Sequence, residues 1–160
     1  MAYYSFKRDL ALSVEAVQLV MEHITDRGMV CHELEGKEEQ KLGDIRVLLD
    51  DCEFTIEVKL DVMAESTGNL CFELSNGKRL TGILETGADE VFYVVPCGKS
   101  RRIFKFEIEK LRKYILDPPN VVMKKGGDKK KFDLALVNMH KIVEDGIPFE
   151  VVEIDAELSI

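Results

Sequence analysis

The sequence predicts an α/β domain with a central mixed β-sheet flanked by helices, and three observations lead to this class. Residues 54–61 alternate apolar and polar side chains without a break, which is typical of a half-buried strand. Residues 91–95 form a nearly continuous apolar run, as expected for a strand buried on both faces of a mixed sheet. Apolar residues between positions 3 and 27 recur at helical spacing, which predicts a helix that ends at Gly28.

Turn signals and alternation place the other elements in chain order. Further strands are predicted at residues 29–34, 43–49, 69–75, 101–106 and 148–154, and further helices at 107–116 and 139–145. Residues 35–41 are expected to be a charged connection, 62–68 a loop and 81–89 a short turn or helix. Pro118 and Pro119 end the helix at 107–116. We expect the strands at 43–49, 54–61 and 69–75 to be adjacent and to share one apolar and one polar face.

Length and composition are those of an ordinary soluble protein. The 160 residues are most simply a single domain, 1–160, with 46% hydrophobic and 32% charged residues. No apolar run approaches the ~20 residues needed to span a bilayer, and no signal peptide opens the chain. We therefore expect no membrane contact and a cytoplasmic location, or a host cytoplasm if the protein is viral.

Two carboxylates and a lysine are expected to converge on one face of a hairpin. The strands at 43–49 and 54–61 flank a polar turn, so residues whose numbers sum to 101 face each other, which places Asp44 opposite Glu57. Alternation along the second strand puts Glu57, Lys59 and Asp61 on one face. Asp61 is therefore a candidate supporting group. The competing interpretation is a surface salt-bridge cluster in water.

The order of these residues resembles the active-site motif of the PD-(D/E)XK nuclease superfamily, with Asp44, Glu57 and Lys59 in the signature positions. One departure is that Gly43 stands where the name of the superfamily has a proline. The resemblance implies a restriction-endonuclease-like core.

Other segments extend the resemblance over roughly residues 15–137. Three segments resemble small phage- and virus-type members of the superfamily. They are Thr-Gly-Asn at 67–69, Glu73, and the stretch at 81–89, which contains two threonines and two glycines and ends in Ala-Asp. The Gly-Gly-Asp at 126–128 is similar to a late element of that group. The ordered set is more specific than Glu-x-Lys alone.

The function implied by the resemblance is that of a Mg²⁺-dependent deoxyribonuclease. Asp44 and Glu57 would hold the ion, with the carbonyl of Val58 and the carboxylate of Glu15 on the first helix as further ligands, and Mn²⁺ is expected to substitute. Lys59 would orient the nucleophile and stabilise negative charge. Asp44, Glu57, Lys59 and Glu15 are thus the predicted catalytic residues, although a glutamate on an amphipathic helix is more often simply solvated.

Basic residues are concentrated late in the chain. The net charge is −8, yet residues 99–131 carry twelve Lys and Arg against four Asp and Glu. Such segregation allows a basic patch to contact phosphates while the rest keeps the protein soluble. The predicted nucleic-acid-binding residues are Lys124, Lys125, Lys129, Lys130, Lys131, Arg101 and Arg102. Alternatively, these cations only solvate a helix and a flexible or disordered surface loop.

The sequence leaves other functions open. A catalytically inactive nucleic-acid-binding module on the same fold and an acidic protein-interaction protein remain alternatives. The absence of a recognition helix favours recognition of DNA structure or ends over sequence, in a resolvase-like or exonuclease-like enzyme. DNA versus RNA and endo- versus exonuclease are undecided, and a homodimer is compatible with the resemblance. Four scattered cysteines without a close pair argue against a thiolate metal site.

Overall fold

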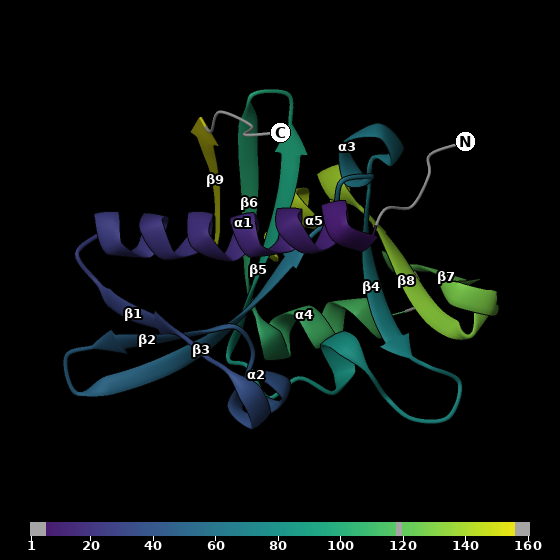
Figure 1. Ribbon diagram of the computed structural model, residues 1–160. Helices are drawn as coiled ribbons and strands as arrows, with labels where there is room; N and C mark the ends of the chain where they lie inside the picture. Colours follow the sequence, from purple (N-terminus) through teal and green to yellow (C-terminus); the bar gives the residue numbers. More distant parts are fainter. Residues whose placement is uncertain (1–5, 118–119, 156–160) are drawn as a thin grey trace.

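A computed structural model of the chain describes residues 6–117 and 120–155. In these residues a six-stranded sheet has the order β1-β2-β3-β5-β6-β9, and a three-stranded sheet has the order β4-β8-β7 (Figure 1). β3 and β5 are parallel, whereas the other neighbours in the large sheet are antiparallel. The predicted α/β class with a central mixed sheet is therefore confirmed. Residues 3–5 of the predicted first helix and the predicted break at Pro118 and Pro119 lie outside the described residues.

The helices and strands that were predicted occur in the predicted order along the chain. The helices are α1 (Phe6–Asp26), α2 (Gly36–Leu42), α3 (Ala64–Thr67), α4 (Ile108–Ile115) and α5 (Met139–Glu144), with short 3₁₀ turns η1 (Gly82–Leu84) and η3 (Asp128–Lys130). The large sheet contains β1 (Val30–Glu33), β2 (Ile45–Leu49), β3 (Cys52–Leu60), β5 (Glu90–Cys97), β6 (Ser100–Glu107) and β9 (Glu150–Asp155). The small sheet contains β4 (Asn69–Ser75), β7 (Val122–Gly126) and β8 (Phe132–Asn138). None of the described helices is long and apolar enough to cross a bilayer.

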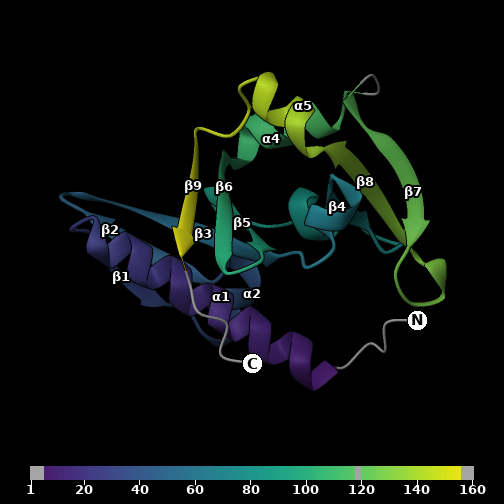
Figure 2. The ribbon, with the colours of Figure 1, turned by 90° about the horizontal axis from the view of Figure 1, so that it is seen from above.

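Helix α1 covers one face of the large sheet, and α4 and α5 lie on the other side (Figure 2). Ala16, Val20 and Ile24 recur every four residues along α1 and are buried against apolar side chains of the sheet. Apolar side chains of β3, including Ile56 and Val58, belong to this same cluster. Because side chains alternate along a strand, Glu57 and Lys59 point to the opposite face.

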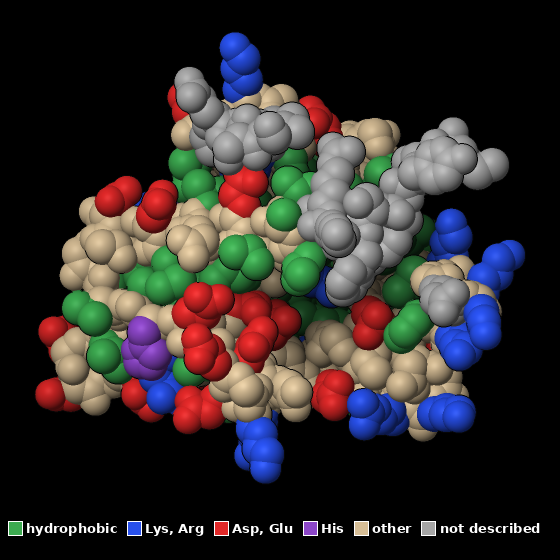
Figure 3. Space-filling model, viewed as in Figure 1, with side chains coloured by type: hydrophobic (Ala, Val, Ile, Leu, Met, Phe, Trp, Pro, Cys, Tyr) green, Lys and Arg blue, Asp and Glu red, His purple; other side chains and the backbone are tan. Residues whose placement is uncertain are grey.

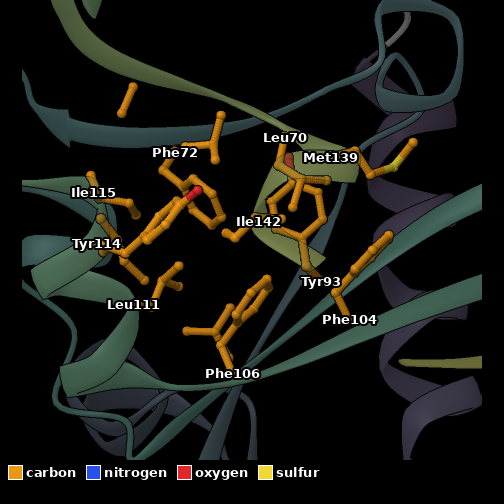
Figure 4. Close-up of a cluster of buried hydrophobic side chains, with 14 of the residues drawn as sticks. Leu70, Phe72, Tyr93, Phe104, Phe106, Leu111, Tyr114, Ile115, Met139 and Ile142 are labelled. Carbon is orange, nitrogen blue, oxygen red and sulfur yellow. The ribbon is translucent and has the colours of Figure 1, made fainter. Parts of the chain in front are cut away.

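Strand β5 is buried on both faces, as its sequence predicts. Residues 91–95 are at most 4% exposed. Phe92 and Val94 pack under α1, whereas Val91, Tyr93 and Val95 pack with β4, β6, β8, α4 and α5 (Figure 4). Full burial of an apolar side chain contributes about 1.5–3 kcal/mol, so β5, which contributes side chains to both cores, stabilises the fold strongly.

Strand β4 is not the neighbour of β3, which corrects the prediction of three adjacent strands. Both hydrogen-bonding edges of β3 are occupied, one by β2 and the other by β5. β4 instead pairs with β8, and its apolar side chains, Leu70, Phe72 and Leu74, pack into the core shared with β5. Alternation correctly identified the faces of β4 but carries no information about its partner strand.

Three segments expected to be irregular have regular structure. The loop predicted at 62–68 contains the short helix α3. The charged connection at 35–41 contains helix α2, which buries none of its residues and therefore lacks the apolar periodicity that predicts a helix. Glu38 and Glu39 in its first turn and Lys41 in its last complement the helix dipole. The basic segment at 124–131 is not an irregular loop, because it contains the end of strand β7, turn η3 and the residue before β8.

An ion-pair network joins α1 to the far edge of the large sheet. Lys105 of β6 is only 5% exposed, and its ammonium lies 2.9 Å from the Glu150 carboxylate and 2.8 Å from Nε2 of His23. Arg27, just beyond α1, also pairs with Glu150, with 2.6 Å between Nη2 and Oε1. The hydrogen bonds from Arg27 and Lys105 lower the pKa of Glu150 to about 2.

We predict that Glu150→Gln lowers the melting temperature near neutral pH, because the buried Lys105 loses its counter-ion. The unfolded carboxyl ionises near pH 4.5 and the folded one near 2, so this stabilisation is complete above the higher value and disappears as pH falls through the lower one. The difference between wild type and variant should therefore narrow between pH 5 and 2 in thermal denaturation. Glu144→Gln, an exposed glutamate at the end of α5, is the control, and an equal effect of both variants would contradict the prediction.

Candidate active site

The predicted hairpin carries the candidate site. β2 and β3 are antiparallel, with Ile45 opposite Ile56 and Val47 opposite Phe54, so the paired numbers sum to 101 as the turn predicts. Asp44 directly precedes β2, and its N–H donates to the carbonyl of Ile56 at 2.8 Å. The register is thus confirmed, and it brings Asp44 to the part of β3 that carries Glu-x-Lys.

Gly43 permits this close approach of β2 to β3. A Cβ atom at position 43 would lie 2.8 Å from the carbonyl oxygen of Ile56, and the φ of Gly43 is 103°. This backbone conformation strains any residue with a side chain, and the φ of proline is fixed near −65°. A proline before Asp44, as in the name of the superfamily, does not fit this geometry.

The three signature groups interact through the backbone and through charge. Oδ2 of Asp44 accepts a hydrogen bond of 2.7 Å from the N–H of Val58, the residue between Glu57 and Lys59. Burial raises the pKa of Asp44, although the bond from Val58 acts in the opposite direction. Burial and then the charge of Asp44 raise the pKa of Glu57 to about 7, while Lys59 opposes this. Ionising both carboxylates therefore costs free energy, which a bound cation would offset.

A small cavity of about 30 Å³ lies beside Glu57 and Lys59, between β3, β4 and η1. Glu73 of β4, Gly82 of η1 and Thr86 are among its lining residues. A cavity of this size has room for water but not for a nucleotide. A nucleotide would therefore have to approach Lys59 from outside this cavity.

The loop at 81–89 approaches the site through two glycines. A Cβ at Gly82 would lie 2.5 Å from the carbonyl oxygen of Glu73, and one at Gly87 would lie 2.6 Å from that of Lys41. Glycine at these positions lets the loop contact both β4 and α2. As a result, the hydroxyl of Thr86 reaches Oε2 of Glu57 at 3.5 Å.

Arg112 of α4 holds this loop in place. Its Nε donates to the carbonyl of Ile83 at 2.8 Å, and its Nη2 donates to the carbonyl of Thr86 at 2.7 Å. Its Nη1 pairs with Glu109 at 2.9 Å. The guanidinium thus holds both ends of the segment 83–86, which places Thr86 beside Glu57.

Asp61 supports the end of β3. Its carboxylate accepts hydrogen bonds from the hydroxyl of Tyr93 and from the N–H of Met63. The same hydroxyl accepts a bond of 2.9 Å from the N–H of Cys71 in β4. Burial and the charge of Asp61 raise the pKa of Tyr93 well above its ordinary value, so the phenol stays protonated. Asp61 therefore anchors β4 beside Lys59.

Glu15 is not brought to the other signature residues. It lies on α1, which packs on the face of β3 opposite to Glu57, and its carboxylate lies 3.8 Å from Nη2 of Arg101. Helical periodicity defines the buried stripe of α1, but it does not say which end of the sheet each flank meets.

The predicted nucleic-acid-binding residues separate into different environments. Arg101, with its side chain 5% exposed, pairs with Glu15 and is not presented to a phosphate. Alternation places Arg102 on the other face, and in the sheet Arg102 lies opposite Glu153. Lys125 pairs with Asp133. The remaining four lysines, Lys124, Lys129, Lys130 and Lys131, are exposed at the edge of the small sheet.

A larger hollow lies on the other side of Thr86. It has a volume of about 480 Å³ and includes Asp89, Glu90, Glu107 and Arg112 in its lining. Asp89 has a structural role, because its carboxylate accepts a hydrogen bond of 2.9 Å from the N–H of Thr55 in β3. Burial raises the pKa of Glu90 to about 7. This hollow contains none of the signature residues.

Comparisons with protein-family models, with curated proteins and with solved structures find no match to this chain. Over residues 6–117 and 120–155, no group of three or more His, Cys, Asp and Glu side chains could hold a metal ion. The carboxylates that the candidate site offers are therefore the pair Asp44 and Glu57. Such a set suits Mg²⁺, which needs only one or two protein carboxylates and keeps several waters.

Thr86 and Arg112 are the site residues that the sequence did not reveal. Thr86 lies in the segment at 81–89 that resembles the nuclease superfamily, so the resemblance pointed to the segment without assigning its role. Arg112 contacts backbone carbonyls far away in the chain, and such contacts leave no local pattern.

We predict that Arg112→Ala lowers the free energy of unfolding by about 1.5–3 kcal/mol, because two loop carbonyls lose a charged donor. Urea denaturation measures this loss. Hydrogen exchange should also accelerate at the N–H groups of Thr86 and Ala88, which lie in and beside the clamped segment. Lys113→Ala, at the exposed next position of α4, should change neither quantity. A stability loss without faster exchange in the loop would show that Arg112 does not hold it.

Proposed function

We propose that the protein is a Mg²⁺-dependent deoxyribonuclease of the PD-(D/E)XK type, with Asp44, Glu57 and Lys59 in the candidate active site. The observation that carries the proposal is the hydrogen bond from the N–H of Val58 to Asp44, because it joins the aspartate to the Glu-x-Lys strand. The order of three antiparallel strands followed by a parallel one, β1-β2-β3-β5, is compatible with a restriction-endonuclease-like core.

Asp44 and Glu57 would hold the ion, with the Val58 carbonyl as the backbone ligand implied by the resemblance. When bound, Mg²⁺ supplies a more acidic water and neutralises charge on the scissile phosphate. Glu15 is left out of this site, because it pairs with Arg101 on the other side of the sheet.

Lys59 would act on the phosphate from the same face of β3. Its positive charge is close enough to Glu57 to oppose the rise in the pKa of that carboxyl. An ammonium at this position orients an attacking water and stabilises the negative charge that develops on the phosphate oxygens. Thr86 would orient Glu57 from the opposite side.

We predict that labelled single-stranded, duplex, flap and four-way-junction DNA is cut in Mg²⁺ or Mn²⁺ and not in EDTA. Lys59→Ala should reduce the cleavage rate by at least about 10²–10³-fold, the effect of losing one group that stabilises transition-state charge. The substrate that is cut fastest identifies the subtype of nuclease.

Lys99→Ala, at an exposed turn of the β5–β6 hairpin, is the matched control and should keep the wild-type rate. DNA binding without cleavage in either metal would show that the protein is an inactive nucleic-acid-binding module and not an enzyme. If the protein neither cleaves nor binds any of these DNAs, the nucleic-acid function is refuted. The acidic protein-interaction alternative would then remain.

We also predict that Mg²⁺ raises the melting temperature of the wild type, because an ion that binds only the folded state stabilises it, by about 2.7 kcal/mol at a hundred times its dissociation constant. Asp44→Asn and Glu57→Gln should abolish this shift in thermal denaturation. Glu15→Gln should retain it in full. A shift that disappears in Glu15→Gln would show that Glu15 is a ligand after all.

A further inference from the structure

The small sheet has one face in the core and one outside it. Leu70, Phe72, Ala135 and Val137 point inward and are buried. The neighbouring positions point outward, and cross-strand pairing aligns them in rows: Cys71 with Leu136 and Val122, and Glu73 with Leu134 and Lys124. We call these six residues the outer face. Val122 is 66% exposed, and Lys124 is exposed as well.

The outer face begins at the candidate active site. Its first strand, β4, is tied to the end of β3 through Tyr93, whose hydroxyl contacts both Asp61 and Cys71. Burial raises the pKa of the Cys71 thiol, and the charges of Asp61, Lys59, Lys124 and Glu73 all act on it. In the sheet, the row that contains Cys71 is next to the row that contains Lys124. Glu73, the carboxylate of this face, lines the cavity with Lys59.

Cations form a rim around the far end of the outer face. Lys129, Lys130 and Lys131 are exposed in and after η3, and Lys78 and Arg79 are exposed in the turn after β4. The two segments are neighbours, because a Cβ at Gly77 would lie 3.2 Å from the carbonyl oxygen of Lys131. Figure 3 shows Lys and Arg side chains gathered at this end of the molecule, over β7 and the turn after β4, apart from the acidic side chains near its centre.

Close contacts between the Gly-Gly pair and two apolar side chains of β8 define the outer face near this rim. A Cβ at Gly126 would lie 2.4 Å from Cδ1 of Leu134, and one at Gly127 would lie 2.4 Å from the ring of Phe132. The Gly-Gly pair therefore leaves room for these two apolar side chains beside the β7–β8 turn. The carboxylate of Asp133 is on the other face, where Ser75 and Lys125 bind it, so it does not oppose an anion on the outer face.

We propose that the outer face binds a single strand of nucleic acid that runs from Lys59 across β4 and β8 to Lys124 and the basic rim. Phosphates would contact Lys124, the rim lysines, Lys78 and Arg79, and bases would lie on the apolar strip of Cys71, Leu134, Leu136 and Val122. Proteins bind single strands with cations that follow the phosphate backbone and with aromatic side chains on which bases stack, and here aliphatic side chains and Cys71 would take the place of the aromatic ones. A duplex presents phosphates and sugars on its outside and would leave this strip facing charge. The inference rests on the proposed function and adds its substrate class and its binding surface.

Site-specific cross-linking tests the location of the strand. Val122→Cys on the outer face and Val30→Cys on β1 are matched, because the two valines are 66% and 64% exposed on strands. Each is made in a background with Cys52→Ser and Cys71→Ser, since Cys52 is exposed and the free Cys71 lies on the outer face, and each carries a photoreactive maleimide. In EDTA, a labelled single-stranded DNA should cross-link from position 122 and not from position 30, and the same DNA annealed to its complement should cross-link less.

Charge reversal tests the basic side chains. Lys124→Glu, and Lys78→Glu with Arg79→Glu, should weaken single-strand binding and reduce the slope of log affinity against log salt by about one for each phosphate that the variant no longer neutralises. Lys99→Glu and Lys113→Glu make the same charge change at exposed lysines elsewhere and should leave the slope unchanged.

Three outcomes would overturn the inference. Equal cross-linking from both positions, equal effects of all the charge reversals, or tighter binding of duplex than of single strand would each remove the outer face as the binding surface, while metal-dependent cleavage would keep the proposed function. Absence of both binding and cleavage for every DNA would instead refute the proposed function, and the inference with it.

Discussion

The burial of β5 on both faces is the constraint on which the rest of the structure depends. A strand with apolar side chains on both sides must lie between two layers, and here α1 forms one layer while β4, β8, α4 and α5 form the other. The parallel pairing of β3 with β5 then fixes where the polar side of β3 can go. Glu57 and Lys59 must emerge between the large sheet and the small one, because the opposite side of β3 is covered by α1.

The candidate site buries two carboxylates, and this burial costs folding free energy. Three glycines, Gly43, Gly82 and Gly87, bring α2, β4 and the loop at 81–89 unusually close around β3. This closeness buries Asp44 and Glu57 and raises the pKa of both. Buried carboxylates with raised pKa values beside a lysine are enriched at functional sites, and this favours the proposal over a surface salt-bridge cluster. In a salt-bridge cluster on an exposed sheet, water would keep both carboxylates near their ordinary pKa values.

Local patterns predicted the parts of this arrangement that local physics determines. The turn at Asp50 and Asp51 fixes the hairpin register, and the apolar run of β5 fixes its burial. What the sequence missed depends on contacts between distant segments: β4 pairs with β8, Arg112 holds a loop, and Glu15 meets Arg101. The polar helix α2 was missed for a different reason, since it has no buried side to give a periodic signal. The twelve cations of residues 99–131 also proved to be divided by the fold, with Lys105 and Arg101 buried in ion pairs and Lys124 exposed.

The most direct test of the candidate metal site is anomalous diffraction from crystals grown or soaked in Mn²⁺. We expect a peak within coordination distance of both Asp44 and Glu57, beside the backbone of Val58, that is absent in Asp44→Asn. A Mn²⁺ peak in the larger hollow at Glu90 and Glu107, or no ordered peak at Asp44 and Glu57, would contradict the central claim that these two carboxylates form the metal site of a nuclease.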